Sequence, residues 1–404
     1  PAPPSNKWRH QSEAAMQFMQ LERGILNMAT GTGKTRTSLL ILEKLLDAKT
    51  ITSAIISTFG NDLLDQWFET ISEWAFSNNI EFTILRQYGS YKELEKYLLE
   101  PRSRILICSR RQLVNALDGL SAEQQKDLIL VHDEVHGLAE PATQKALTGR
   151  LKPVRYSLGL SATPIRDYDD AGTEFIFREV GDVIFTFSLQ DAIERGILCE
   201  FDYMGLEYEL TENDKKRIGK AYSIYHAKIK SGQAPSKETL WRDIARVYKT
   251  AEQKPLVFEK YVRDFPNSLL NSIIFVETKS LGDKLLPTIH DITHKFSTYY
   301  DTDGPEILQS FTSGNIDCLI TCHRLSQGID IQHLQNVFLV SSNRGHLETT
   351  QRIGRCLRSN PTNPIKRATI IDFIRAENDA NNASNSDQLR SDWLTTLSEV
   401  KRNE

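Results

Sequence analysis

The residues with the clearest chemistry form the run Met-Ala-Thr-Gly-Thr-Gly-Lys-Thr at positions 28–35, with Met28 where the strict pattern has Gly. An apolar run precedes this segment, and a helix-forming run at residues 37–46 follows it. Glycines in such a loop let backbone N–H groups close around phosphates at the start of a helix. Lys34 can reach the β and γ phosphates of a nucleotide, and the Thr35 hydroxyl can coordinate Mg²⁺. We expect the loop to bind ATP through Thr30, Gly31, Thr32, Gly33, Lys34 and Thr35.

A second chemical signature is the run His-Asp-Glu-Val-His at residues 132–136, directly after the apolar run at residues 128–131. A carboxylate pair at the carboxyl end of a strand suits a nucleotide enzyme. Asp133 can hold Mg²⁺ through water, and Glu134 can polarise the attacking water. A zinc-protease site would need Glu directly after the first His, and a helix beneath both residues. Here Asp follows His132 and a strand leads in, so we expect nucleotide chemistry rather than a zinc site.

These two motifs need strands to position them, and the chain supplies alternating apolar and helix-forming segments over residues 24–163 and again over about 272–374. Such alternation is typical of parallel sheets covered by helices, so we predict an α/β fold with two parallel-sheet domains. No repeat with the period of a solenoid recurs. The expected strands are residues 24–28, 54–58, 105–108, 128–132 and 156–160, followed by 273–276, 296–300, 318–321, 337–340 and 368–373.

The composition agrees with a folded protein of this size. The chain has 404 residues, is 40% hydrophobic and 25% charged, and carries a formal net charge of −4. These values favour two domains and exclude a disordered polyelectrolyte. No apolar run is long enough to span a bilayer, so we expect no membrane association. The first four residues lack a start Met and a signal pattern, so we expect further sequence upstream in the parent protein.

The five cysteines are too few and too scattered for a disulfide framework, and we expect reduced thiols in a cytoplasmic or otherwise intracellular protein. Cys318 and Cys322 would lie on one face of a strand, which could also suggest half of a metal site. No second pair accompanies them, which favours buried structural thiols.

Residues 211–263 form a basic, helix-forming segment without strand-like runs, with 13 Lys and Arg against 6 Asp and Glu. One interpretation is a solvated helical connector. The other is a polyanion contact, for which the candidate residues are Lys215, Lys216, Arg217 and Lys220. A polar tract at residues 377–385 and a short amphipathic helix end the chain.

The order of the two motifs resembles that of superfamily-two helicases and translocases, and the likeness extends from residue 8 to about residue 375. Residues 8–11, Trp-Arg-His-Gln, resemble the segment in which a Gln reads the adenine edge, which implies nucleotide contacts for Arg9 and Gln11. Residues 64–67 resemble the first strand-contact motif, which implies nucleic-acid contacts for Gln66 and Trp67. Its common Pro-Thr start is replaced by Ser-Thr at positions 57 and 58.

Later segments resemble the superfamily's coupling and second-domain motifs. Ser161 and Thr163 belong to the coupling motif at residues 161–164, and residues 274–277 resemble the opening of the second domain. Residues 321–330 are similar to the fifth motif, although Gln327 stands where an acidic residue is frequent. The fifth motif implies nucleotide contacts for Gly328 and Asp330.

Residues 351–358, Gln-Arg-Ile-Gly-Arg-Cys-Leu-Arg, resemble the sixth motif closely. Guanidinium groups stabilise the charge that develops on the γ-phosphoryl group, so we expect Arg355 and Arg358 to act as arginine fingers. Arg352 is expected to form interdomain or structural ion pairs. Gln351, together with His136 and Thr163, could form a polar relay between hydrolysis and domain closure. Each of these three could equally be a satisfied core polar group.

Asp-Glu-Val-His and the Gln-led sixth motif are most similar to the DExH subgroup of restriction-type translocases and nucleotide-excision-repair helicases. This likeness implies two RecA-like domains in tandem, ATP and Mg²⁺ bound at their cleft, and a preference for DNA over RNA. The expected boundaries are 1–195 for the first domain, 196–268 for a connector with the basic helical insert, 269–376 for the second domain, and 377–404 for a polar linker and helix.

The expected function is an ATP-dependent helicase or duplex translocase, in which closure on hydrolysis steps the strand. The resemblance implies a role in restriction, phage defence or repair. One alternative is an ATP- and nucleic-acid-gated switch that regulates a partner without processive movement, and another is an RNA helicase. No nuclease motif is evident, so a nuclease would lie upstream or in a partner subunit.

Overall fold

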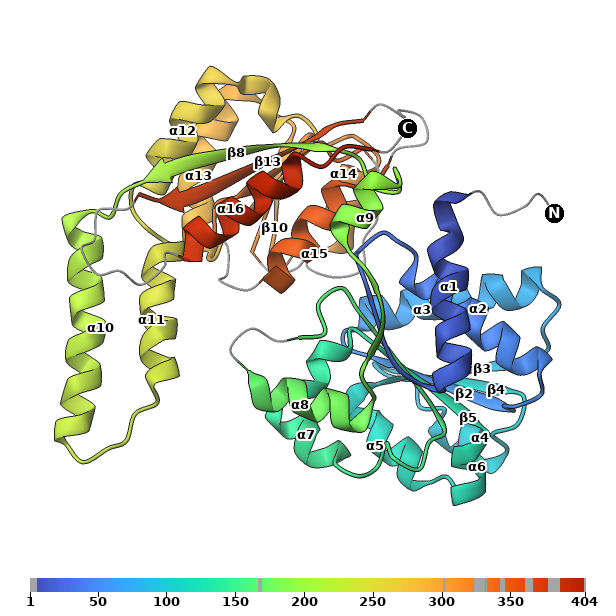
Figure 1. Cartoon of the computed structure of the whole chain (residues 1–404). Coiled ribbons are helices and arrows are strands. Elements are labelled where there is room, and N and C mark those ends of the chain that lie inside the picture. The colour runs from blue at the N-terminus through green and yellow to red at the C-terminus, as the bar shows by residue number, and fades with distance from the viewer. Residues whose placement is uncertain are drawn as a thin grey trace. The chain divides into compact units, whose positions relative to one another are not determined.

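The computed structural model describes residues 6–165, 169–300, 303–322, 331, 333–341, 346–359, 366–376 and 386–402. The chain divides into two compact units, Pro1–Ile197 and Leu198–Glu404 (Figure 1). Each unit contains one parallel β-sheet, and together they form the expected tandem of RecA-like α/β domains. No helix among the described residues is long and apolar enough to cross a membrane.

The first unit is built on a seven-stranded sheet in the order β3-β4-β2-β5-β6-β1-β7. Every residue of the central strands β2, β5 and β6 is buried, because helices cover both faces of a parallel sheet. The strands are β1 (Arg23–Met28), β2 (Ser53–Thr58), β3 (Thr83–Gln87), β4 (Arg104–Ser109), β5 (Leu128–Asp133), β6 (Tyr156–Ser161) and β7 (Val183–Phe187).

Helices connect these strands and cover the sheet. They are η1 (Asn6–Trp8), α1 (Arg9–Leu21), α2 (Lys34–Asp47), α3 (Asn61–Ser77), α4 (Leu94–Leu99), α5 (Arg110–Asp118), α6 (Ala122–Lys126), η2 (Val135–Ala139), α7 (Pro141–Leu147), α8 (Asp170–Glu179) and α9 (Leu189–Glu194).

The second unit is built on a six-stranded parallel sheet in the order β10-β11-β9-β12-β13-β8. Its strands are β8 (Phe201–Tyr208), β9 (Ser272–Phe275), β10 (Phe296–Tyr299), β11 (Cys318–Thr321), β12 (Asn336–Leu339) and β13 (Ala368–Arg375). Its helices are α10 (Glu212–Lys230), α11 (Lys237–Lys249), α12 (Lys254–Asp264), η3 (Pro266–Leu269), α13 (Lys279–Ile292), α14 (Pro305–Thr312), α15 (His346–Cys356) and α16 (Ser386–Ser398).

All ten expected strands are present, and β3, β7 and β8 are additional strands that the sequence did not predict. Each of these three lies at an edge of its sheet, where part of the strand remains exposed. Strands β3 and β8 mix polar and apolar residues, so they lack the continuous apolar run that marks a buried strand, whereas β7 is apolar at four of its five positions and was overlooked. Since β8 lies inside the expected connector 196–268, that segment contributes a strand to the second sheet. The C-terminal helix α16 also packs on this sheet, against β13 and β8.

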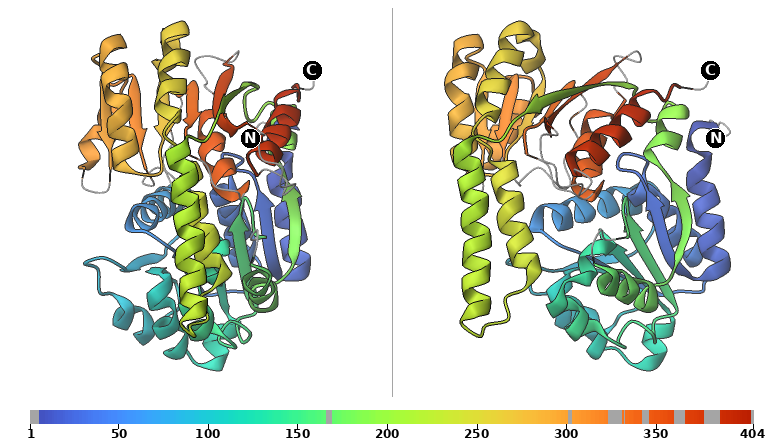
Figure 2. Two further views of the ribbon diagram at one scale, coloured as in Figure 1. Left: turned by 90° about the vertical axis from the view of Figure 1, so that its left-hand side faces the viewer. Right: turned by 60° about the vertical axis from the view of Figure 1, so that its left-hand side comes forward.

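Between β8 and α12, the chain forms a helical hairpin of α10 and α11, which projects away from the second sheet in all views (Figures 1 and 2). In α10 only Asp214 is buried, whereas α11 buries Leu240, Ile244 and Val247 at helical spacing. The carboxylate of Asp214 accepts hydrogen bonds at the base of the hairpin from Thr211, Arg217 and the backbone N–H of Glu252. The hairpin is therefore anchored at its base and exposed along most of α10.

Buried charges hold α16 and α12 to the second sheet. The Arg390 guanidinium donates to both carboxylate oxygens of Asp372, at 2.8 and 3.0 Å, and to Asp387 at 3.1 Å. Lys254 is 3% exposed, and its Nζ donates to the carbonyl of Val340 at 2.7 Å. Burial lowers the pKa of Lys254 to about 8.

The lowered pKa of Lys254 predicts that the free energy of unfolding changes with pH in the alkaline range. Below pH 8 the lysine is charged in both folded and unfolded chains, so the folded state carries the full free-energy cost of burying the charge. Between about pH 8 and the ordinary lysine value of 10.5, the unfolded chain binds more protons, so stability rises with pH. Across this range we expect the wild type to gain at most about 3 kcal/mol relative to Lys254→Met. Urea unfolding of both proteins at several pH values measures this difference, and a constant difference would contradict it.

Candidate nucleotide-binding site

The phosphate loop, the carboxylates and the coupling residues of the first unit all follow neighbouring strands. Strand β6 lies between β5 and β1, with Asp133 opposite Leu160 and Asn27 opposite Ser161. The carboxyl ends of these three parallel strands therefore meet at one edge of the sheet, where ligands bind in open α/β folds.

The loop between β1 and α2 has the backbone of a phosphate cradle. Gly31 and Gly33 have φ angles of 85° and 89°, in the left-handed region that residues with a Cβ rarely adopt. Gly33 is the N-cap of α2, and no side chain caps the first N–H groups of this helix. Lys34 opens the helix, and its Nζ donates to the carbonyl of Met28 at 3.1 Å. Uncapped N–H groups and a nearby ammonium group fit the phosphates of a nucleotide.

Helix α1 supports this loop from the other side. The carbonyl of Thr32 lies 2.8 Å from His10 Nε2 and accepts a hydrogen bond from Gln11 Nε2 at 3.2 Å. The φ of Gly33 favours glycine there, and a Cβ would lie only 2.2 Å from Gln11 Nε2, so a side chain at this position would also displace the end of Gln11. Arg9 is exposed and pairs with Glu13 at 2.9 Å. In this structure Gln11 binds the loop itself, and the nucleotide contacts of Arg9 and Gln11 stay predictions.

Asp133 ends β5 as a buried carboxylate, 6% exposed. Its Oδ2 accepts a hydrogen bond from the indole N–H of Trp67 at 2.8 Å, and its Oδ1 accepts one from the backbone N–H of Glu134 at 2.9 Å. Burial, followed by the adjacent Glu134 charge, raises the pKa of Asp133, while the Trp67 donor and Lys34 oppose this shift. A carboxylate held in this orientation, with Lys34 close enough to affect its pKa, suits a magnesium ligand.

The turn that carries the carboxylates is held by a buried arginine whose role the sequence did not predict. Glu134 has a φ of 48°, in the left-handed region, and Arg110 donates to the carbonyls of both Asp133 (2.9 Å) and Glu134. Arg110 opens α5 and is 9% exposed. A Cβ on Gly137 would lie 1.9 Å from its guanidinium, so only glycine leaves room for it. The sequence feature that could have indicated this role is the pair Arg110 and Arg111, which directly follows the buried strand β4.

The three expected coupling residues of the first unit lie together. His136 Nδ1 lies 3.3 Å from the Ser161 hydroxyl and 3.4 Å from a carboxylate oxygen of Glu134. The backbone N–H of Thr163 donates to the same hydroxyl at 3.1 Å. Polar contacts therefore link Glu134, directly after β5, through His136 to Ser161 at the end of β6 and to Thr163.

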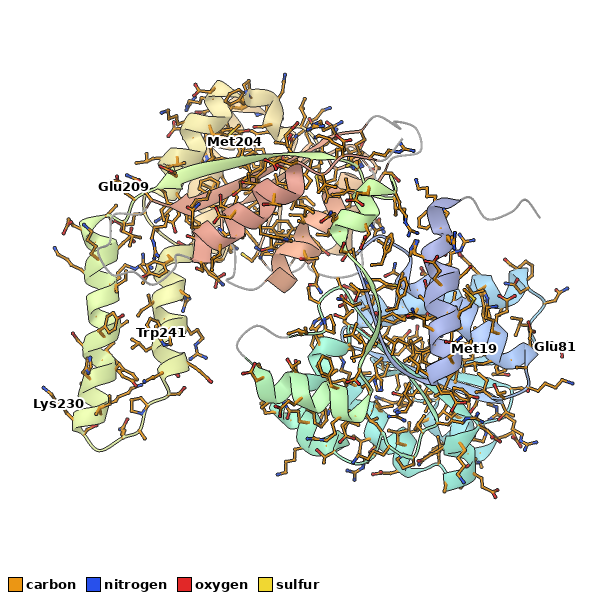
Figure 3. The ribbon with its side chains drawn as sticks, in the orientation of Figure 1. Met19, Glu81, Met204, Glu209, Lys230 and Trp241 are labelled. Atoms are coloured by element: carbon orange, nitrogen blue, oxygen red, sulfur yellow. The ribbon has the colours of Figure 1, made fainter. Side chains whose placement is uncertain are left out.

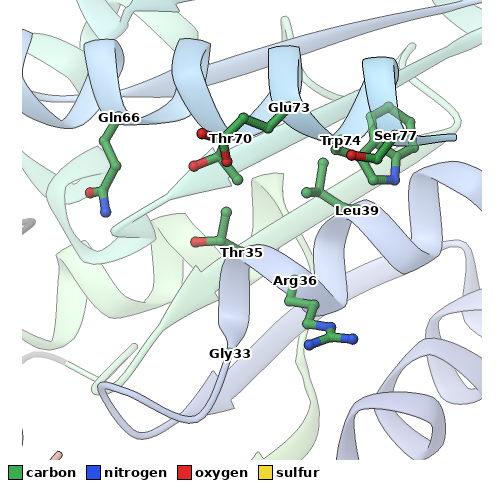
Figure 4. A pocket seen from close by; sticks show the side chains of 9 residues that line it. All are labelled: Gly33, Thr35, Arg36, Leu39, Gln66, Thr70, Glu73, Trp74 and Ser77. Carbon is green, nitrogen blue, oxygen red and sulfur yellow. The ribbon is translucent and has the colours of Figure 1, made fainter. Parts of the chain in front are cut away.

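Helix α3 carries the two residues expected to contact nucleic acid, and the structure places them differently. Trp67 is 2% exposed and bonded to Asp133, so the prediction that it contacts a strand is corrected. Gln66 is exposed and lines a groove of about 620 Å³ between α2 and α3, opposite Thr35 (Figure 4). The lining residues are Gly33, Thr35, Arg36, Leu39, Gln66, Thr70, Glu73, Trp74 and Ser77.

In the second unit, Gln351 and Arg352 of the sixth motif are buried in α15. Arg352 donates to the carbonyl of Ser341 at 2.6 Å and stacks on the Phe275 ring, which indicates a structural role. Arg358 forms a backbone bridge with Leu198. The side chain of Arg355, together with Gly328 and Asp330, lies outside the described residues.

The four basic residues proposed for polyanion contact differ in their surroundings. Lys216 and Lys220 are exposed, and Lys215 is exposed but pairs with Glu212 at 2.9 Å. Arg217 binds buried Asp214 at 2.9 Å and Thr250 at 2.8 Å. Arg217 is therefore part of the base of the hairpin, and its assignment as a phosphate contact stays a prediction.

Comparison with known proteins identifies the family. Residues 6–166 match the family described as type III restriction enzyme, res subunit, and residues 256–360 match the helicase conserved C-terminal domain. The chain belongs to superfamily two of the helicases and translocases. The two matched segments lie in the two units and include the phosphate loop and the sixth motif.

Relatives of this superfamily-two chain include DNA 3'-5' translocase XPB2 of Sulfurisphaera tokodaii, which is 23% identical over 387 residues, covering 90% of this chain and 80% of the relative. Among solved structures, the type ISP restriction-modification enzyme LlaBIII bound to DNA aligns with a TM-score of 0.62 at 18% identity. That alignment covers 99% of this chain but 30% of LlaBIII. The Pyrococcus furiosus Hef helicase domain aligns with a TM-score of 0.58 at 14% identity, covering 96% of this chain and 97% of that domain.

Proposed function

We propose that this chain hydrolyses ATP to move along or unwind nucleic acid, with DNA as the favoured substrate. The observation that carries the proposal is the meeting of the phosphate loop, Asp133 and Glu134 at one sheet edge, with a polar connection leading away through His136 and Ser161. The relatives described as a DNA translocase and a DNA-bound restriction enzyme support DNA over RNA. A role in restriction, phage defence or repair belongs to the same proposal.

In the proposed mechanism, the uncapped N–H groups at the start of α2 and Lys34 bind the β and γ phosphates. Thr35 and Asp133 would hold Mg²⁺, and the bound ion would supply positive charge that offsets the charge of the phosphoryl group. Glu134 orients the attacking water, and Arg110 fixes the turn that positions this carboxylate. Positioning and electrostatic stabilisation supply most of the catalysis in phosphoryl transfer.

The remaining roles rest on the resemblance and stay part of the proposal. Arg355 and Arg358 would stabilise the charge on the γ-phosphoryl group, and Gln351 would report hydrolysis to the second unit. Gly328 and Asp330 would contribute to nucleotide binding.

The decisive experiment measures ATP hydrolysis in the presence of single-stranded and duplex DNA and RNA. Stimulation by DNA is expected, and equal or greater stimulation by RNA would instead support an RNA helicase. Strand-displacement and triplex-displacement assays then separate unwinding from duplex translocation. Stimulated hydrolysis with no activity in either assay would favour a switch that regulates a partner, and no hydrolysis with any nucleic acid would refute the proposal.

The exposed part of the hairpin is proposed as a phosphate contact, which predicts a change in salt dependence. Lys230 ends α10 and Trp241 projects from α11, and both lie away from the second sheet (Figure 3). Each phosphate that a lysine neutralises contributes about 0.9 to the slope of log affinity against log salt for B-form DNA. Replacing the exposed lysines by Gln should therefore flatten the slope. The residues to replace together are Lys216, Lys220, Lys228 and Lys230.

A charge-matched control replaces four exposed lysines of the first unit, which are Lys44, Lys49, Lys126 and Lys152. Fluorescence anisotropy with labelled duplex DNA at several salt concentrations measures both slopes. Equal slopes for the wild type and the hairpin variant would show that these lysines only keep the hairpin soluble.

A further inference from the structure

The bond between Trp67 and Asp133 joins two elements that are 66 residues apart in the chain. Trp67 lies in the second turn of α3 and is among the largest fully buried or nearly buried side chains of the first unit. Its indole N–H donates to Asp133 Oδ2 at 2.8 Å, and both groups are removed from solvent. A hydrogen bond to a charged group in such surroundings is short and strong.

This bond restricts how the carboxylate can rotate. The indole is a donor only, so it can satisfy Asp133 but cannot compete with it for a cation. The backbone N–H of Glu134 occupies Oδ1, and the indole occupies Oδ2. Each oxygen keeps further lone pairs, and their direction is set by the two donors. Donors of this kind orient metal-binding side chains, and their loss typically lowers metal affinity about 10- to 100-fold.

Helix α3 also faces the phosphate loop through the neighbouring residue. Gln66 is exposed and lines the groove that it shares with Thr35 and Gly33 on the loop and α2 (Figure 4). Two adjacent residues of α3 thus face different parts of the site. Trp67 binds the carboxylate of Asp133, and Gln66 lines the groove beside the phosphate loop. A displacement of α3 would therefore move the donor that orients Asp133.

We propose that Trp67 is a positioning residue for Asp133, and that it couples the placement of α3 to the binding of Mg²⁺ with nucleotide. The inference rests on the proposed function, because the orientation of Asp133 matters in this way only if the site binds Mg²⁺ and ATP. It assigns to α3 a role that its exposed surface alone would not indicate.

The first test compares Trp67→Phe with Trp241→Phe. Both variants replace an indole, but Trp241 is 50% exposed on α11 of the second unit and is not among the proposed nucleotide-binding residues. Binding of a fluorescent ATP analogue is measured as a function of Mg²⁺ concentration, without hydrolysis. We expect Trp67→Phe to need about tenfold more Mg²⁺ for half-maximal binding, with unchanged affinity in the absence of Mg²⁺. Trp241→Phe should match the wild type.

Thermal unfolding of each variant shows whether the protein is folded, since Phe leaves part of the Trp67 site empty. A folded Trp67→Phe with the same Mg²⁺ dependence as Trp241→Phe overturns the positioning role. A loss of affinity that is equal with and without Mg²⁺ also overturns it, because that pattern indicates a general structural defect. A wild type that binds no nucleotide with Mg²⁺ refutes the proposed function itself.

A second measurement uses the wild type, in case Trp67→Phe does not fold. The chain has five tryptophans, so isotope-labelled tryptophan gives at most five indole N–H resonances. Replacing each of the other four in turn assigns the Trp67 resonance by elimination. Addition of Mg²⁺ to the nucleotide-bound protein should shift this resonance. An unchanged Trp67 resonance, with Mg²⁺-dependent nucleotide binding intact, would overturn the inference.

Discussion

ATP turnover is expected to fall about a thousandfold when Lys34 is replaced by Ala. The ammonium group of Lys34 lies at the loop, where its Nζ donates to the carbonyl of Met28 at 3.1 Å. In the proposed complex it neutralises charge on the β and γ phosphates, and no other cation in the phosphate-loop motif replaces it. The side chain is only partly buried, so the fold should survive its removal.

Lys44→Ala is a matched control, because Lys44 is exposed on the same helix and lies more than two turns from the loop. Phosphate release measures turnover, and circular dichroism confirms that each variant is folded. Turnover of a folded Lys34→Ala variant within a few-fold of the wild type would refute the assignment of the phosphate loop.

Glu134→Gln should separate nucleotide binding from hydrolysis. Gln keeps the shape of the side chain but cannot polarise the attacking water, so hydrolysis should fall by about a hundredfold to ten-thousandfold. Nucleotide binding should persist, because the phosphate loop is unchanged. We therefore expect the ATP-bound complex with nucleic acid to accumulate. Equilibrium binding of a fluorescent ATP analogue and retention of labelled DNA with ATP measure the two effects.

The control for this variant is Glu174→Gln, which changes an exposed carboxylate on α8. Normal hydrolysis by Glu134→Gln would show that another group activates the water. Loss of nucleotide binding together with hydrolysis would show instead that Glu134 is needed to form the site.

Much of the site and of the fold could be predicted because the relevant physics is local. A glycine-rich loop between an apolar run and a helix requires positive φ angles, and Gly31 and Gly33 have them. Buried central strands need continuous apolar runs, so β2, β5 and β6 were visible in the sequence. The edge strands β3 and β8 were not, since one side of each remains open and their residues are of mixed polarity, whereas the apolar run of β7 was present in the sequence but was not recognised as a strand.

The sequence by itself thus determined ten of the strands and the superfamily, and it placed the glycine-rich loop before α2 and the carboxylate pair at the end of β5. Only the tertiary structure decided which polar and aromatic side chains are buried and what they bind. Trp67 binds Asp133, Arg110 holds the turn at Glu134, and Arg217 pairs with buried Asp214. Tryptophan and arginine side chains occur both exposed and buried in proteins, so residue type alone does not decide where each of these three lies. The free energy of burying a polar group depends on the partner that packing brings to it, and for Trp67 that partner is 66 residues away in the chain.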